Sequence, residues 1–150
     1  MWDMFVAGSE GPSTNTYWAF LILMLYPDIQ SRMHEEMCQR IGKHRLPTYD
    51  DRHRLSYCQA VLAEILRFNG FNRFFSRTPT ENTVVGKYTI PKDALVLFSV
   101  DTVHFDDDYF KESNKFNPDR FLTKDGEFTG NNRNFTFGLG KTYILFFFYK

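Results

Sequence analysis

The chain has 150 residues, of which 43% are hydrophobic and 24% are charged, a composition typical of a globular domain and not of a disordered chain. Its 18 basic and 18 acidic residues balance, so no long-range field favours nucleic acid or anionic lipid as a partner. The 17 phenylalanines predict either a wide core or apolar faces left open because neighbouring chain is missing.

The first predicted element is one long helix. It covers residues 1–26, ends at Pro27, and is expected to bulge or kink where Gly8, Gly11 and Pro12 interrupt the helical pattern. Its apolar C-terminal part, residues 17–26, is shorter than the roughly 20 residues that cross a bilayer. We therefore expect that part to be a buried helix.

Three further helices are predicted in the first half of the chain. Residues 27–41 form an amphipathic helix that Gly42 ends. A short helix follows, and then a longer one over residues 57–68. Two capping-box pairs indicate where these last two begin, namely Thr48 with Asp51 and Ser56 with Gln59.

The second half of the chain is predicted to contain strands and loops. Residues 83–90 and 94–100 are rich in β-branched and aromatic side chains and predict a small sheet around a turn at residues 91–93. Residues 106–134 read mostly as loop, with a helical turn near Tyr109. The sequence thus predicts a mainly α fold with a small β-sheet.

One carboxylate and two guanidinium groups are the main candidate cluster. Glu64 and Arg67 are three residues apart on the helix predicted over residues 57–68, so their side chains share one face. Such a pair is usually an exposed ion pair of small energetic value. Here the neighbouring residues are apolar and predict burial. A buried pair needs a third group, and Arg120, in the proline-containing turn at residues 116–121, offers it.

Four motifs of the chain together resemble the cytochrome P450 family, the heme-thiolate monooxygenases, and most closely its microsomal branch. They occur in the family's order. Residues 7–10 (Ala-Gly-Ser-Glu) resemble the oxygen-activating segment of the distal helix, 64–67 (Glu-Ile-Leu-Arg) the Glu-x-x-Arg helix, 116–121 (Phe-Asn-Pro-Asp-Arg-Phe) the meander motif, and 137–141 (Phe-Gly-Leu-Gly-Lys) the opening of the cysteine loop.

The resemblance implies a partial P450 fold, from the distal helix through the start of the cysteine loop. It divides residues 1–150 of this single partial domain into four parts. These are a helical part (1–70), a small sheet (71–100), the meander with the start of the heme loop (101–141), and an aberrant tail (142–150).

The resemblance also implies roles for individual residues. Glu64, Arg67 and Arg120 would form a structural network that holds the meander beneath the heme, and Glu10 would be a catalytic residue that carries a proton. For Arg77, a solvated arginine before a strand stays the alternative to a heme contact. The cofactor-binding residues implied by the family are Ala7, Gly8, Arg77, Phe137 and Gly140.

The sequence departs from the family at two places. Gly11 stands where the family has a threonine that relays protons, and Ile144 stands where it has the cysteine that binds iron. An isoleucine cannot bind iron, so no metal ligand is expected. Cys38 and Cys58 lie on helices that the resemblance places away from the iron, and packing is their expected role. The break indicates a frameshift, a retained intron or a true loss.

We therefore expect the C-terminal half, incomplete at both ends, of a microsomal monooxygenase. The parent enzyme would insert one oxygen atom from O2 into a lipophilic substrate, with heme b as cofactor and electrons from an NADPH-dependent reductase. By resemblance it would lie at the cytoplasmic face of the endoplasmic reticulum membrane and reach that membrane only through an absent N-terminal region. No nucleic acid is expected as a partner.

The chain as written is expected to be inactive. The alternative is a non-catalytic gene fragment or misfolding product without heme, because residues 144–149 form an uncharged, β-prone segment of the kind that aggregates.

Overall fold

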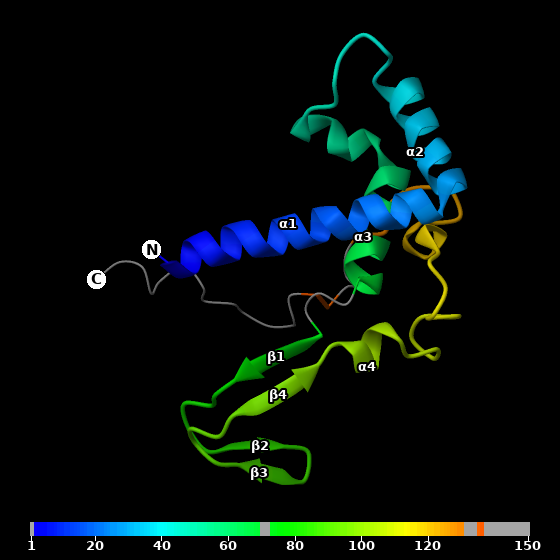
Figure 1. Ribbon diagram of the computed structural model, residues 1–150. Helices are drawn as coiled ribbons and strands as arrows, with labels where there is room; N and C mark the ends of the chain where they lie inside the picture. Colours follow the sequence, from blue (N-terminus) through cyan, green and yellow to red (C-terminus); the bar gives the residue numbers. More distant parts are fainter. Residues whose placement is uncertain (1, 70–72, 131–134, 137–150) are drawn as a thin grey trace.

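Helices dominate the structure, and the strands form two small antiparallel sheets (Figure 1). The computed structural model describes residues 2–69, 73–130 and 135–136. In chain order the elements are α1 (Trp2–Leu25), α2 (Pro27–Arg40), η1 (Tyr49–Arg54), α3 (Ser56–Phe68), β1 (Phe74–Arg77), β2 (Thr83–Val85), β3 (Tyr88–Ile90), β4 (Val96–Ser99), α4 (Asp101–His104) and η2 (Pro118–Phe121). The predicted fold class, mainly α with a small β-sheet, is confirmed.

The first helix, α1, continues through its proline. Pro12 has no amide hydrogen, so the carbonyl of Gly8 loses its helical donor. Gly8 is exposed, and water can replace that donor. The described part of α1 is α-helical throughout, and Figure 1 shows a straight rod. The expected bulge or kink is therefore wrong.

Among the side chains of α1 that the structure describes, one face is buried. Ile22 is 3% exposed and packs in a cluster with Ile29 of α2 and Val61 of α3. The prediction that the C-terminal part of α1 is buried is wrong for its other faces, because α2 and α3 contact only one side of the helix (Figure 1). The apolar residues on the exposed faces include Tyr17, Phe20, Met24 and Leu25. Within the described residues, no helix is long and apolar enough to span a bilayer.

The helix α3 is capped by a side chain from α2. Ser56 and Gln59 do not form the predicted capping box, so that prediction is wrong. Instead, the two carboxylate oxygens of Glu36 accept the amides of Tyr57 and Cys58 at 2.8 and 2.9 Å. A carboxylate here satisfies amides that have no helical acceptor and also opposes the positive end of the helix dipole.

The other predicted capping box is present at the start of η1. The amide and the hydroxyl of Thr48 both donate to Oδ2 of Asp51 at 2.8 Å. Arg45 adds a two-pronged contact to the same carboxylate, at 2.6 and 2.7 Å. The hydrogen bonds from Arg45 and Thr48 hold the pKa of Asp51 far below its usual range.

The strands pair in two antiparallel sheets of two strands each. β1 pairs with β4, with Phe74 opposite Ser99, and β2 pairs with β3, with Thr83 opposite Ile90. Gly86 lies in the tight turn between β2 and β3 with a positive φ of 60°, a conformation that glycine adopts easily. The sequence predicted two strands, at residues 83–90 and 94–100, around a turn at residues 91–93. Instead, the turn at Gly86 divides the first into β2 and β3, and the second contains β4, which pairs with β1. The sequence missed β1 and α4, because a four-residue element carries little periodicity.

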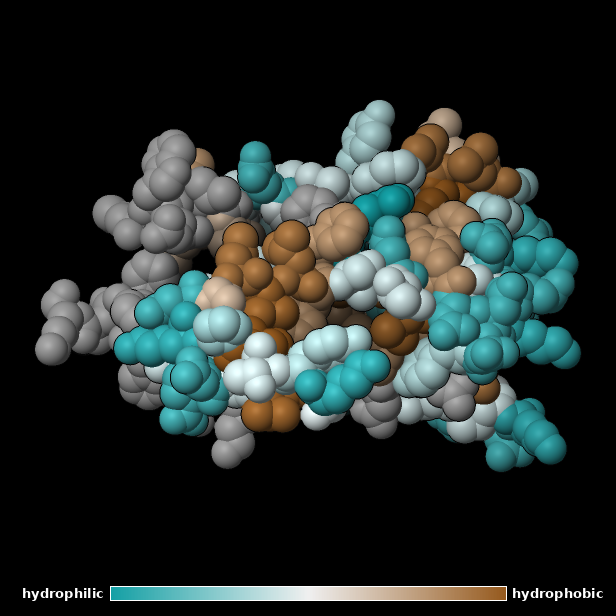
Figure 2. All heavy atoms as spheres, turned by 90° about the horizontal axis from the view of Figure 1, so that it is seen from below, coloured by the Kyte–Doolittle hydropathy of each residue, from teal (hydrophilic) through white to brown (hydrophobic). Residues whose placement is uncertain are grey.

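Large apolar side chains of both sheets are exposed. Each of Phe74, Leu97, Phe98, Val84 and Val85 has more than half of its surface open to solvent. Figure 2 views the molecule from the side of the strands and shows hydrophobic residues gathered on this face. Open apolar faces, one of the two outcomes that the composition predicted, are therefore present, while other phenylalanines such as Phe110 and Phe121 lie in the core.

The centre of the described core is α3. One apolar cluster joins it to α1 and α2, and a second joins it to the segment around η2 through Ala60, Ala63, Phe110 and Phe121, each at most 2% exposed. The side chains on the inner face of α3 are therefore among the most enclosed of the described residues. This location decides what the charged residues of α3 can do.

Candidate functional site

Two charged residues of α3 are completely buried. Glu64 and Arg67 are both 0% exposed, and their three-residue spacing places them on one face of the helix. Nε and Nη2 of Arg67 donate to the two carboxylate oxygens of Glu64 at 2.7 and 2.8 Å. The contact is therefore bidentate, the strongest geometry available to this pair.

The third charge comes from η2, far along the chain. Nε of Arg120 donates to Oε1 of Glu64 at 3.1 Å, and the backbone amide of Asn117 donates to the same oxygen at 2.9 Å. The side-chain oxygen of Asn117 accepts the amide of Asp119 at 3.0 Å, and Pro118 begins the helix. The start of η2 is thus shaped locally so that Arg120 reaches Glu64.

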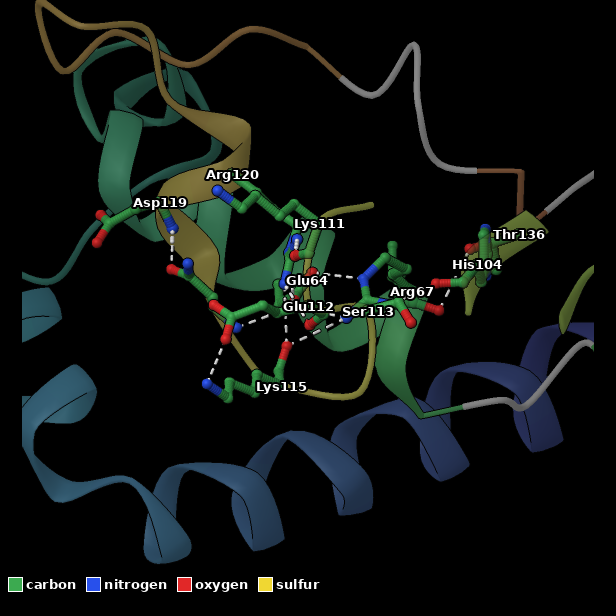
Figure 3. Close-up of polar contacts among 12 residues, drawn as sticks. Glu64, Arg67, His104, Lys111, Glu112, Ser113, Lys115, Asp119, Arg120 and Thr136 are labelled. Carbon is green, nitrogen blue, oxygen red and sulfur yellow. Dashed lines mark hydrogen bonds and ion pairs between the residues drawn. The ribbon is translucent and has the colours of Figure 1, made fainter. Parts of the chain in front are cut away.

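Backbone carbonyls complete the cluster (Figure 3). Nη1 of Arg67 donates to the carbonyl of His104 at 2.5 Å. Arg120 donates to three carbonyls, those of Lys111, Glu112 and Lys115, at 2.9, 3.3 and 3.0 Å. The two guanidinium groups therefore fix the path of the chain between α4 and η2 through its main chain.

Aromatic rings enclose this charged cluster. The Cζ atom of Arg67 lies 5.1 Å from the ring centre of Phe110 and 5.6 Å from those of Phe68 and Phe105. Burying these charges costs several kcal/mol per ion unless each is paired and hydrogen-bonded. Within the described residues, no buried side-chain nitrogen or oxygen lacks a partner. The cluster can therefore remain charged in the core.

The ring of His104 extends the cluster toward residue 135. His104 is 3% exposed, and its Nε2 accepts the backbone amide of Phe135 at 3.0 Å. Burial, together with the nearby charge of Arg67, lowers the pKa of His104 from 6.5 to about 4. The sequence did not point to this residue, since its four histidines showed no ligand spacing.

Two more contacts were missed by sequence reasoning. Ser113, which is fully buried, donates from its hydroxyl to the carbonyl of Phe105 at 2.9 Å. Nδ2 of Asn69 donates to Oδ1 of Asn15 at 2.5 Å and joins the end of α3 to α1. Neither contact has a sequence signal. Asn117, the N-cap of η2, had one, because an asparagine directly before Pro-Asp fits a helix N-cap.

Comparison with known proteins identifies the family. The family described as Cytochrome P450 matches residues 1–143 of the chain. This chain belongs to the cytochrome P450 family. It is 36% identical over 144 residues to Cytochrome P450 2A4 of Mus musculus, 38% identical over 142 residues to Cytochrome P450 2E1 of Sus scrofa, and 36% identical over 143 residues to Cytochrome P450 1A1 of Chelon auratus.

These alignments cover nearly all of this chain and a minor part of each relative. They include 95% of the chain for the 2A4 protein and 93% for the other two, but only 29%, 28% and 27% of the relatives. The chain thus spans less than a third of the length of the P450 proteins it matches. The resemblance drawn from the motifs is confirmed at the level of the family.

The other predicted site residues are exposed or lie outside the described residues. Ala7, Gly8 and Glu10 lie exposed on the N-terminal half of α1. A Cβ atom at Gly8 would meet no described atom within 4 Å. Arg77 is exposed on β1 and donates from Nη1 to the carbonyl of Ser76 at 2.9 Å. Three predicted positions, Phe137, Gly140 and Ile144, lie outside the described residues.

Neither cysteine of this P450 chain fits the role of an iron ligand. Cys58 is 7% exposed on α3, and burial raises the pKa of its thiol to about 12, with a smaller effect from Glu36. Cys38 lies on α2, with its Sγ 3.5 Å from Nε2 of His34. Figure 1 places α2 at the end of α1 opposite to residues 7–10.

The described residues therefore supply no thiolate suited to bind a heme iron. They contain no group of three or more histidine, cysteine, aspartate or glutamate residues that could hold a metal ion. A cavity of about 460 Å³, lined by residues such as Met37, Ile41 and Leu46, lies at the end of α2 and is not part of the Glu64 cluster. Of the site residues predicted from the sequence, the described structure brings together Glu64, Arg67 and Arg120 in the buried charged cluster.

Proposed function

We propose that this chain is a segment of a P450 monooxygenase, an enzyme that inserts one oxygen atom from O2 into a lipophilic organic substrate. The observation that carries the proposal is the buried cluster of Glu64, Arg67 and Arg120 in a chain that belongs to this family. Heme b would be the cofactor, and an NADPH-dependent reductase would supply electrons. By family, the parent protein would lie at the cytoplasmic face of the endoplasmic reticulum membrane.

The role of the cluster in this proposal is structural. Among the described residues, its three side chains form hydrogen bonds to one another and to the main chain; Glu64 and Arg67 are fully buried, and the side chain of Arg120 is 10% exposed. A group this enclosed cannot touch a substrate. Glu64, Arg67 and Arg120 would therefore hold the segment between α4 and η2 in the shape that supports a cofactor site.

The residues on α1 and β1 would line that site. Ala7 and Gly8 have small side chains that let a flat cofactor approach the helix, and Gly8 has open space where a Cβ would be. Glu10 would carry a proton, and Arg77 would face a propionate of the heme. Phe137 and Gly140 complete the proposed set of cofactor contacts.

We further propose that the chain as given does not perform this reaction. Ile144 stands at the position of the cysteine ligand, whereas Cys58 is buried on α3 and Cys38 is partly exposed on α2. Without a thiolate, the electron donation that favours cleavage of the oxygen–oxygen bond is missing. The alternative is a non-catalytic gene fragment or misfolding product that binds no heme, for which the apolar segment 144–149 is the supporting observation.

A spectroscopic comparison separates these outcomes. The chain, its Ile144→Cys variant and its Ile144→Ala control are each reconstituted with heme, reduced and exposed to carbon monoxide. We expect a thiolate-type Soret band only in Ile144→Cys. A thiolate-type band in the unchanged chain would refute the proposed inactivity. Failure of every variant to bind heme would favour the non-catalytic alternative.

The nucleotide sequence offers a second test. If another reading frame or a splice junction just past the codon for Lys141 encodes arginine, cysteine and glycine at the family's spacing, the loss of the cysteine comes from a frameshift or a retained intron. If no such sequence is present, the loss is genuine.

A further inference from the structure

Two residues directly before the glycine-rich segment 137–141 are fixed by hydrogen bonds from two sides. The amide of Phe135 donates to Nε2 of His104 at 3.0 Å, and Oγ1 of Thr136 donates to the carbonyl of Leu66 at 3.3 Å. Thr136 is 5% exposed. These contacts anchor the short stretch to α4 on one side and to α3 on the other.

His104 is bonded to the buried ion pair as well. Its backbone carbonyl accepts Nη1 of Arg67 at 2.5 Å, while its ring accepts the amide of Phe135 (Figure 3 shows His104 beside Arg67 and Thr136). The ring also stacks on Phe135, with centres 6.4 Å apart and planes at 27°, and meets Phe110 edge-on at 6.2 Å. One residue thus touches both the charged cluster and the residues that lead into the glycine-rich segment.

The direction of the bond to Phe135 fixes the state of the ring. A nitrogen that accepts a hydrogen bond carries no proton, so the neutral ring of His104 must hold its hydrogen on Nδ1. The charged groups that influence the ring are Arg67 on α3, which opposes protonation, and Asp101 on α4, which favours it. Burial and Arg67 prevail, and the ring stays neutral at physiological pH.

We propose that His104 is a positioning residue whose Nε2 couples the buried Glu64 and Arg67 pair to the chain that enters the glycine-rich segment. This goes beyond the scaffold proposed above, which ends at the meander. It rests on the proposed function only for the importance of that segment to a P450. The contact itself can be tested without heme, so a failure to bind heme would leave the result intact.

The test uses two substitutions in the full chain. His104→Phe keeps a ring that can stack but has no acceptor, whereas His104→Gln keeps an acceptor at a similar reach. The readout is amide hydrogen exchange at Phe135. The amides of Tyr57 and Cys58, which Glu36 caps at a distance from His104, serve as controls for intact folding.

We expect exchange at Phe135 to be about tenfold faster in His104→Phe, as the loss of one buried hydrogen bond implies, and to return toward the original rate in His104→Gln. The control amides should exchange at unchanged rates in both. An unchanged rate at Phe135 in His104→Phe would overturn the proposal.

A measurement on the unsubstituted chain decides the matter if His104→Phe also exposes the control amides. Long-range proton–nitrogen NMR spectra report which ring nitrogen of His104 is protonated. A proton on Nδ1 and none on Nε2 supports the proposal. A proton on Nε2 overturns it, since that atom could not then accept the amide of Phe135.

Discussion

Replacing Glu64 by alanine tests whether the buried cluster stabilises the fold. The carboxylate accepts Nε and Nη2 of Arg67, Nε of Arg120 and the amide of Asn117. After Glu64→Ala, Arg67 stays at a 0% exposed position, and among the described residues its remaining hydrogen-bond acceptors are the backbone carbonyls of His104 and Lys115. Breaking a buried ion pair in this way costs about 3–5 kcal/mol.

The retained carbonyls place the expected loss near the lower end of that range. They still solvate part of the guanidinium charge, so we expect the free energy of unfolding to fall by about 3 kcal/mol, a large fraction of the roughly 5–15 kcal/mol of a typical domain. Urea unfolding followed by circular dichroism measures the change, and a lower midpoint of unfolding is the expected result.

An exposed ion pair provides the matched control. Glu112 and Lys115 also form a contact three residues apart, but their side chains are 56% and 71% exposed. Glu112→Ala should leave the urea midpoint unchanged, because exposed pairs contribute little. A loss below about 1 kcal/mol for Glu64→Ala, the value of one ordinary hydrogen bond, would show that the cluster does not hold the meander to α3.

Three further outcomes are expected. Glu36→Gln should lower the unfolding free energy by about 1 kcal/mol, since α3 loses a charged cap, whereas the exposed Glu35→Gln should not; equal urea midpoints for the two variants would contradict the cap. Thiol labelling followed by mass spectrometry should modify Cys38 before unfolding and Cys58 only after it, because the pKa of the buried thiol is raised to about 12. The unfolded chain protonates His104 near pH 6.5 and the folded chain only near pH 4, so the stability that the neutral ring contributes is full above about pH 6.5 and falls as the pH drops toward 4. Over this pH range the urea midpoint should therefore fall less in His104→Gln than in the unchanged chain. An equal fall in the two proteins would refute the lowered pKa of His104.

The sequence predicted the helices better than the strands. The amphipathic pattern of residues 27–41 and Gly42 at its end gave α2 almost to the residue, because the periodicity was long enough to read. The start of α3 was explained wrongly, since Ser56 and Gln59 matched a local pattern while the cap came from Glu36 on another helix. Tertiary contacts of this kind leave no local signature.

The candidate site was predictable only where the residues neighbouring it in sequence carried a signal. Burial of Glu64 and Arg67 followed from their apolar neighbours, and the need for a second guanidinium pointed to Arg120, which the structure places 3.1 Å from Glu64. His104 could not be found this way. Its carbonyl accepts Arg67 and its ring accepts the backbone amide of Phe135. Contacts of this kind depend on where the main chain runs, which the identity of a residue does not reveal.

The two guanidinium groups hold the segment between α4 and η2 by its main chain and not by its side chains. Arg120 binds the carbonyls of Lys111, Glu112 and Lys115, whose side chains point to solvent. Carbonyl groups are common to all amino acids, so substitutions at these three positions leave every acceptor in place. The amino acids at positions 111 and 115 can therefore change over generations while the route of the polypeptide stays constant, because Arg67 and Arg120 preserve that route. Position 112 is more restricted, since Glu112 has a positive φ of 54°, which bulky or β-branched residues avoid.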